Sequence, residues 1–244
     1  MKKIAIFILV ALSWCACHQP GKVVSKTSKI HMIDSTLDAI QDTQYLAYLE
    51  PIKTELETQL NEANGYAPKD LEVYQPECPM LNWASDALYE MAKQLCPEQV
   101  DMAVVNIGGM RCNWGTGNIT FRHVFELMPF DNELVVLTMT GKEILALCDV
   151  FAKCGGQGVA GLRMSASKGV LRSAKIAGKD VVPEAYYTVA TSDYLSQGND
   201  GMTPLKNYEA MWKSERKIRD LYIEYIQQMK TVEAKVDGRM DVGL

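Results

Sequence analysis

Several features that mark common functional classes are scarce or absent in this sequence. Basic residues do not outnumber acidic ones: 25 lysines and arginines stand against 30 aspartates and glutamates, for a net charge of -5. The lysines and arginines are scattered, so the chain lacks the positive stripe that attracts a nucleic-acid polymer. We therefore expect no polymeric nucleic acid as a partner. A small phosphorylated ligand is compatible with this charge distribution, because its binding needs only a few local arginines and backbone donors.

Long hydrophobic runs are also lacking, apart from Ile4 to Leu12 near the start. This run follows two lysines and is too short to span a bilayer, which is typical of a bacterial export signal. Cysteines close the run as they do in lipoprotein signals. We favour Cys17 over Cys15 as the lipidated residue, because Cys17 follows the small Ala16; simple secretion is the alternative. The sequence thus predicts a protein of the bacterial cell envelope, exported and held at the membrane by a lipid anchor.

Cysteine spacing excludes the usual zinc sites, since the remaining five cysteines match no zinc-ligand pattern. Their number is odd, so an exported chain of this kind keeps at least one free thiol. A disulfide among the others is permitted but cannot be assigned from the sequence. These residues are Cys78, Cys96, Cys112, Cys148 and Cys154.

The order of expected elements indicates an α+β fold, with mixed sheets covered by helices and a helix at the N-terminal side. We predict an export signal over residues 1–17, a polar tether over 18–33 and one domain over 34–244. Apolar periodicity, capping residues and glycine or proline breaks set the bounds. Helices are expected over 34–64 with an interruption at Pro51, and over 81–95, 120–127, 141–151 and 214–229; strands are expected over 100–105, 133–140, 159–165, 170–177, 186–191 and 236–240.

The loop from Asn106 to Arg111 has the chemistry of a ligand-binding segment at a strand end. Gly108 and Gly109 let backbone approach a ligand where side chains would collide. Arg111 offers a planar fork of donors suited to phosphate or carboxylate, and Asn106 can both donate and accept. A surface turn with a solvated arginine is the alternative for this motif taken alone.

Three further segments complete the chemistry of a nucleotide site. Met128 to Asn132 places Phe130 between a helix end and a strand, and Gly158 to Gly161 opens a strand between glycines. Asp193 to Gly201 places Tyr194 six residues before Asp200. Two aromatic rings can stack on a base, and an aspartate suits the vicinal hydroxyls of ribose. Core packing of the two rings, and a turn-forming role for the aspartate, are the alternatives.

In this order the motifs resemble the C-terminal domain of the 5′-nucleotidase family. The pattern is Asn-x-Gly-Gly-x-Arg, then Pro-Phe-x-Asn, then a glycine-containing strand start, then aromatic-Leu-x-x-Gly-x-Asp-Gly. Residues from Glu77 to Ala87 resemble the opening helix of that domain, and Val236 to Met240 resembles its closing strand. The resemblance therefore covers residues 77–240.

The resemblance implies a role for each matching residue. Phe130 and Tyr194 would clamp the base, Asp200 would hold ribose, and Asn106 and Arg111 would reach sugar and phosphate. Tyr194 stands where phenylalanine is usual, and Tyr74 or Pro76 stands where the family usually has an arginine. The candidate substrate-binding residues are Asn106, Gly108, Gly109, Arg111, Phe130, Asn132, Tyr194 and Asp200.

Histidine is too scarce for the family's hydrolytic chemistry. Family members cleave phosphate esters at a two-metal centre on a separate N-terminal metallophosphoesterase domain. This chain has only His18, His31 and His123, and no Asp-x-His or Gly-Asn-His segment. We therefore expect no catalytic residue or metal ligand here, with the divalent metals on a metallophosphoesterase partner chain. The alternative is an envelope-anchored lipoprotein that binds nucleosides or nucleotides without a hydrolase partner.

Overall fold

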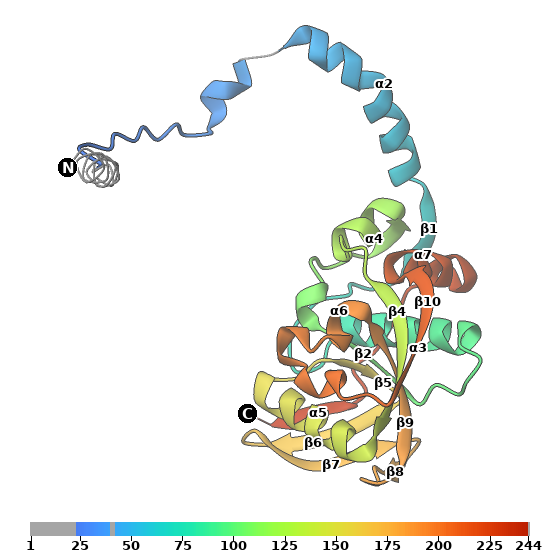
Figure 1. Cartoon of the computed structure of the whole chain (residues 1–244). Coiled ribbons are helices and arrows are strands. Elements are labelled where there is room, and N and C mark those ends of the chain that lie inside the picture. Colours follow the sequence, from blue (N-terminus) through green and yellow to red (C-terminus); the bar gives the residue numbers. More distant parts are fainter. Residues whose placement is uncertain (1–22, 40–41, 244) are drawn as a thin grey trace, which may run out of the picture. The chain divides into compact units, whose positions relative to one another are not determined.

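A computed structural model describes residues 23–39 and 42–243 (Figure 1). The chain divides into two compact units, residues 1–50 and 51–244. The predicted export signal and Cys17 lie outside the described residues. Residues 23–33 are exposed and form no regular secondary structure, as a tether would. A short 3-10 helix η1 (Ser35–Ala39) follows, and helix α2 (Thr43–Leu60) runs across the division between the units. None of the helices in the described ranges is long and apolar enough to cross a membrane.

The second unit mixes helices and strands throughout its length. Its longer helices are α3 (Pro79–Leu95), α4 (Phe121–Leu127), α5 (Gly141–Cys154) and α7 (Ile218–Met229), with short helical turns η2 (Ile107–Gly109), α6 (Asp193–Ser196), η3 (Asn199–Gly201) and η4 (Thr203–Lys206). Its strands are β1 (Ala63–Ala67), β2 (Met102–Val105), β3 (Gly117–Thr120), β4 (Glu133–Thr140), β5 (Gly158–Ala160), β6 (Leu162–Ser167), β7 (Val170–Ile176), β8 (Lys179–Asp180), β9 (Tyr186–Ser192), β10 (Ala210–Lys217) and β11 (Met240–Gly243).

Three sheets result from the strand pairing. The largest has the order β10-β4-β9-β2-β5, in which β2 and β9 are parallel and the other neighbours are antiparallel. A second sheet has the order β11-β6-β7-β8, and β1 pairs with β3 alone. Because parallel and antiparallel pairs are mixed and helices pack on the sheets, the predicted α+β class is confirmed.

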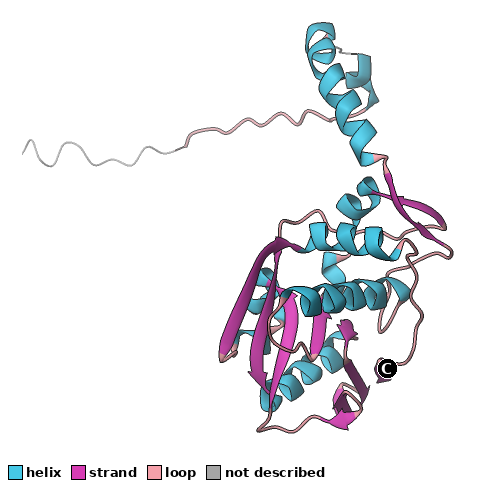
Figure 2. Ribbon diagram, turned by 90° about the vertical axis from the view of Figure 1, so that its right-hand side faces the viewer, coloured by secondary structure: helices cyan, strands magenta, loops and turns pink. Residues whose placement is uncertain are grey.

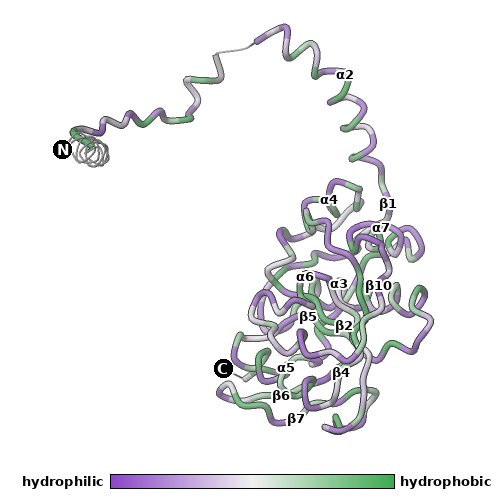
Figure 3. The backbone as a smooth tube through the Cα atoms, in the orientation of Figure 1, coloured by the Kyte–Doolittle hydropathy of each residue, from purple (hydrophilic) through white to green (hydrophobic). Residues whose placement is uncertain are grey.

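The large sheet separates two hydrophobic cores, as the alternation of side chains along its strands requires. Ala103 and Val105 of β2 face one core, which is closed by α3 and α7. Met102 and Val104 face the other, which is closed by α5 and the second sheet. Helices accordingly lie on both sides of the strands in Figure 2, and hydrophobic segments gather between them in Figure 3. The strands are therefore held rigidly from both faces.

Several sequence predictions agree with these elements. Strand β4 begins and ends at the predicted residues, and α3 extends the predicted helix by two residues to Pro79. Thr140 caps α5, since its hydroxyl accepts a hydrogen bond from Glu143 N at 3.4 Å. The five described cysteines are all free thiols.

Two predicted helix features are wrong. Helix α2 continues through Pro51 instead of stopping there. A proline inside a helix removes one backbone hydrogen bond, and here that loss falls on an exposed helix where water can satisfy the carbonyl. The predicted helix from Ser214 also begins too early, since β10 occupies residues up to Lys217 and pairs with β4. The backbone hydrogen bonds of this segment come from pairing with the edge of the sheet, and the periodicity of the sequence alone does not predict that pairing.

Two boundaries also differ from prediction. The first predicted helix ends at Leu60 instead of at residue 64, and strand β1 follows from Ala63; a Cβ at Gly65 would lie 2.7 Å from Ile226 Cγ2. The last strand starts at Met240 instead of at residue 236. The backbone N–H groups of Asp237 and Gly238 donate to the carboxylate of Glu77, which lies just before α3, and not to a neighbouring strand.

Candidate functional site

Three connections of the chain meet at one edge of the large sheet. Strands β2 and β9 are parallel neighbours, so they end at the same edge, whereas β4 runs antiparallel to β9 and begins there. Asn106 follows β2 directly, Tyr194 lies just after β9, and Phe130 lies just before β4. The topology therefore brings together three of the four segments that the sequence singles out.

A cavity of about 390 Å³ opens at this edge. This volume falls within the usual range of small-molecule sites. The side chains that surround it combine two aromatic rings, a carboxylate, two amides and a guanidinium with a glycine pair. Its lining consists of Asn106, Gly108, Gly109, Arg111, Phe130, Asn132, Tyr194 and Asp200, which are the eight residues named from the sequence.

The glycine pair lies close against other residues of the cavity. A Cβ at Gly109 would come within 2.8 Å of Asn106 Oδ1, and a Cβ at Gly108 would lie 3.4 Å from Asp200 Oδ2. The loop is also held from behind, because Gln157 Oε1 accepts a hydrogen bond from Ile107 N at 2.7 Å. A Cβ at position 109 would therefore displace the Asn106 amide, whereas glycine leaves this side chain in place.

Arg111 provides a cationic group that is largely uncommitted. Its guanidinium donates one hydrogen bond, from Nη1 to Gly108 O at 3.1 Å, and its backbone N donates to Leu127 O. It forms no ion pair with any carboxylate in the part of the chain that the structure describes. Most of its donors can therefore serve an anionic ligand.

The two segments that carry the aromatic rings of the cavity are linked through the side chain of Asp193. Phe130 and Tyr194 are each 38% exposed, so both offer ring surface to solvent. The Asp193 carboxylate accepts hydrogen bonds from Glu133 N at 3.0 Å and from Tyr194 N at 2.8 Å. One side chain therefore ties the start of β4 to the loop that follows β9, and it fixes the segments that carry the two rings.

Helix α7 holds the Phe130 segment from the other side. Arg219 donates to the Phe130 carbonyl at 3.4 Å and pairs with Asp131 at 2.8 Å. Lys217 also pairs with Asp131, and these hydrogen bonds lower the pKa of the Asp131 carboxyl below its usual value. The guanidinium of Arg219 lies 4.2 Å from the centre of the Phe125 ring. The Phe130 segment is thus anchored by cations of the β10–α7 region.

Asp200 is bound by two other residues of the same cavity. Tyr194 Oη donates to Asp200 Oδ1 at 2.8 Å, and Asn106 Nδ2 donates to Asp200 Oδ2 at 2.5 Å. The hydrogen bond to this carboxylate raises the pKa of the Tyr194 hydroxyl above its usual value. The backbone of Asp200 is left-handed, with φ of 53°, a conformation that aspartate tolerates better than most residues.

The fourth segment, Gly158 to Gly161, does not line the cavity. Gly158 to Ala160 forms the buried strand β5 beside β2, and Gly161 packs on the Asp101 carbonyl. The sequence interpretation of this segment as part of a nucleotide site is therefore wrong, although Gln157 immediately before it supports the Asn106 loop. Sequence reasoning also missed Asp193 and Arg219, since their roles depend on which strands are neighbours and no local motif marks them.

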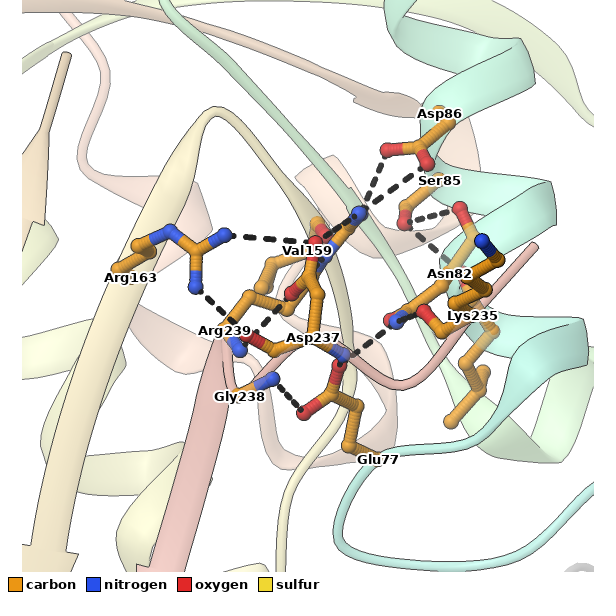
Figure 4. Close-up of polar contacts among 11 residues, drawn as sticks. Glu77, Asn82, Ser85, Asp86, Val159, Arg163, Lys235, Asp237, Gly238 and Arg239 are labelled. Carbon is orange, nitrogen blue, oxygen red and sulfur yellow. Dashed lines mark hydrogen bonds and ion pairs between the residues drawn. The ribbon is translucent and has the colours of Figure 1, made fainter.

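The two outer motifs of the resemblance meet in a separate polar cluster (Figure 4). Glu77 accepts hydrogen bonds from Asn82 Nδ2 at 2.7 Å and from the backbone N of Asp237 and Gly238 at 2.8 and 3.0 Å. Arg239 pairs with both Asp86 and Asp237. These contacts join α3 and the residue Glu77 just before it to the segment before β11, which lies about 160 residues later in the sequence. The two motifs therefore stabilise the fold and do not line the cavity.

The electrostatics of this cluster follow from burial and pairing. Burial raises the pKa of Asp86 despite its pairing with Arg239. Hydrogen bonding to Arg239 lowers the pKa of Asp237. Within the described ranges no three histidine, cysteine or carboxylate side chains gather as a metal-binding group.

Comparison with known proteins supplies a family and several relatives. The family model described as "5'-nucleotidase, C-terminal domain" matches residues 58–207. Protein UshA of Escherichia coli is 26% identical over 224 residues, which cover 88% of this chain and 40% of that protein. A 5'-nucleotidase of Vibrio vulnificus is 30% identical over 178 residues, or 69% of this chain and 31% of the relative. The chain thus spans about 40% or less of the length of these relatives.

Solved structures give the same result. A 5'-nucleotidase precursor from Thermus thermophilus matches with a TM-score of 0.73 and 25% identity, over 84% of this chain and 43% of that one. The NAD nucleotidase of Haemophilus influenzae matches in fold with a TM-score of 0.58 at 20% identity, over 82% of this chain and 41% of that one. Both matches cover less than half of the larger protein.

Proposed function

Since this chain belongs to the 5'-nucleotidase C-terminal domain family, we propose that it recognises nucleotides for a 5′-nucleotidase-type hydrolase of nucleotide catabolism. The observation that carries the proposal is the lining of the 390 Å³ cavity. It combines two half-exposed rings, a carboxylate bound by neighbouring donors and an uncommitted arginine. These groups match the base, the sugar hydroxyls and the phosphate of a nucleoside monophosphate, respectively.

The proposed arrangement follows the chemistry of each group. Phe130 and Tyr194 stack on the base, a contact of about 1–3 kcal/mol per base. Asp200 accepts hydrogen bonds from the sugar hydroxyls, and Asn106 and Asn132 offer amide donors and acceptors nearby. Arg111 and the exposed Gly108 receive the phosphate, because a guanidinium fork and exposed backbone suit its oxygens. The chain's part in the reaction is binding and orienting the substrate.

We assign the hydrolytic step to a separate metallophosphoesterase chain. The bound divalent metals would supply the activated water and neutralise charge on the phosphate there. The relatives are more than twice as long as the region they share with this chain, which leaves room in them for such a domain. The scarcity of histidine, with only His18, His31 and His123, and the lack of an Asp-x-His or Gly-Asn-His segment in the sequence support the same division.

The proposal also includes export to the bacterial cell envelope and a lipid anchor at Cys17. The charged start, the short apolar run to Leu12 and the Ala16-Cys17 pair support it. An envelope location would place the domain where extracellular nucleotides arrive. The exposed segment over residues 23–33 would then act as the tether between the anchor and the folded part.

Calorimetry of the purified chain with AMP and adenosine tests the recognition role. We expect binding of both, with Phe130→Ala weakening each by about 5- to 150-fold, which corresponds to about 1–3 kcal/mol of lost stacking. Tyr186→Ala is the matched control, because Tyr186 is an exposed aromatic outside the cavity lining. Intact folding is checked by circular dichroism. Absence of binding by the folded wild type would refute the recognition role.

A phosphate-release assay tests the division of labour. We expect no metal-dependent hydrolysis of AMP by this chain alone and hydrolysis when a metallophosphoesterase encoded beside it is added. Hydrolysis by the chain alone would contradict the assignment of catalysis to a partner. Binding without hydrolysis under any pairing would instead favour the envelope-anchored binding lipoprotein.

A further inference from the structure

The hydroxyl of Tyr194 makes a contact that a phenylalanine could not make. It donates to Asp200 Oδ1 at 2.8 Å, while Asn106 Nδ2 donates to the other carboxylate oxygen at 2.5 Å. We propose that Tyr194 is a positioning residue for Asp200, and that its hydroxyl makes the cavity selective for ligands with a vicinal diol. The inference rests on the proposed nucleotide-binding function and goes beyond it by assigning sugar selectivity to one hydroxyl group.

Asp200 needs such support because its backbone segment is short, exposed and left-handed. It lies between Gly198 and Gly201, which also have positive φ, and Asp200 itself has φ of 53°. An exposed carboxylate on such a turn has several side-chain rotamers in reach. Fixing it before the ligand arrives removes the cost of immobilising a side chain during binding.

Tyr194 restrains this turn through both its backbone carbonyl and its side-chain hydroxyl. Its carbonyl accepts a hydrogen bond from Asn199 Nδ2 at 2.8 Å, and its hydroxyl donates to Asp200. The same carbonyl also accepts from Gln197 N. The segment from Tyr194 to Asp200 is therefore closed on itself, and the ring that would stack on a base also sets the position of the carboxylate.

The bound carboxylate keeps the capacity to take a diol. An ionised carboxylate has about four acceptor sites on its two oxygens, and Tyr194 and Asn106 use one on each. One site is left on each oxygen, which matches two adjacent hydroxyl donors of a ribose ring. The hydrogen bond to this carboxylate also raises the pKa of the Tyr194 hydroxyl, because deprotonation would remove the donor and place a second negative charge beside Asp200.

The test compares adenosine with 2′,3′-dideoxyadenosine, which carries the same base but lacks the diol. Calorimetry on the full chain uses the wild type, Tyr194→Phe and the control Tyr186→Phe, whose hydroxyl lies outside the cavity. Tyr194→Phe keeps the stacking ring. We expect its affinity for adenosine to fall about three- to tenfold, as for loss of one preordered side chain, with dideoxyadenosine affinity changed less than about twofold.

The possible outcomes separate this inference from the proposed function. Equal losses for both ligands would show that the hydroxyl only places the ring, and an increased adenosine preference would show that it competes with the sugar. Either result overturns the inference and leaves the proposed nucleotide binding intact. A wild type that binds both ligands equally well also overturns the inference. A wild type that binds neither ligand refutes both. In an Asp200→Ala background we expect Tyr194→Phe to have no further effect, and a persistent adenosine-specific loss would overturn the inference.

Discussion

Replacing Arg111 with alanine separates phosphate recognition from nucleoside recognition. The guanidinium donates within the described chain only to the Gly108 carbonyl, so its removal leaves no buried charge without a partner. The loop itself stays anchored, because the Arg111 backbone N still donates to Leu127 O and Gln157 still binds Ile107 N. The loss should therefore fall on the ligand rather than on the fold.

The magnitude follows from the exposure of the side chain. Hydrogen bonds to charged groups contribute about 1.5–3 kcal/mol, and an exposed site with high local dielectric lies near the lower end. We expect Arg111→Ala to weaken AMP binding by about 1–2 kcal/mol, or about 5- to 30-fold, and adenosine binding by less than about twofold. Arg111→Lys keeps the charge without the fork and should lie between wild type and alanine.

Calorimetry at low and high salt provides the measurement. Screening shortens the reach of an exposed charge, so the difference between wild type and Arg111→Ala should shrink as salt rises from about 0.05 to 0.5 M. Arg172→Ala is the matched control, because Arg172 is an exposed arginine on β7 outside the cavity. Equal losses for AMP and adenosine would refute the phosphate role, and so would a salt-independent difference.

Three other changes test separate parts of the molecule. Gly109→Ala places a Cβ 2.8 Å from Asn106 Oδ1 and displaces the Asn106 amide from Asp200, so nucleotide binding should weaken about 2- to 12-fold, for a lost hydrogen bond of about 0.5–1.5 kcal/mol. Gly115→Ala meets no atom within 4 Å and should bind normally. Burial raises the pKa of the Cys148 thiol to about 12, above the unfolded value of about 8.5, so this group's contribution to stability is complete below about pH 8.5 and is lost as pH rises toward 12. Urea unfolding at pH 7.5 and at pH 10 should show that this thiol lowers the free energy of unfolding by up to about 2 kcal/mol at the higher pH. The decrease should be smaller in Cys148→Ala and unchanged in the exposed-thiol control Cys154→Ala. A decrease in Cys148→Ala as large as in the wild type would contradict the assignment. Cys17→Ala should abolish labelling by radioactive palmitate while Cys15→Ala keeps it, and labelling unchanged by Cys17→Ala would disprove the anchor site.

Local signals in the sequence were enough to predict the elements around the cavity. Strand β4 is rich in valine, leucine and threonine, follows Pro129 and ends at the capping residue Thr140, and β2 is a short valine-rich run, so both were predictable without tertiary information. The eight cavity residues lie in loops that begin or end at such strands. Loop chemistry at strand ends is visible in sequence because glycine, proline and aromatic residues there stand out against apolar runs.

Features that depend on neighbours far along the chain were not predictable in this way. Strand β10 has a polar, partly helical sequence and is a strand because β4 offers it a free edge. Gln157 and Asp193 support the cavity only because β5 lies beside β2 and β4 lies beside β9. Neither residue stands out among the other polar residues of the chain, so their support for the loops required the strand order.

The contacts of Glu77 set a limit on when this protein can finish folding. Glu77 is 5% exposed, and two of its three hydrogen-bond donors are backbone groups of Asp237 and Gly238, which lie 160 and 161 residues later in the sequence. Without them a buried carboxylate keeps a single neutral donor, at a cost of several kcal/mol. During synthesis the segment around Glu77 therefore cannot reach its final packing until Asp237 and Gly238 have been made and can meet it.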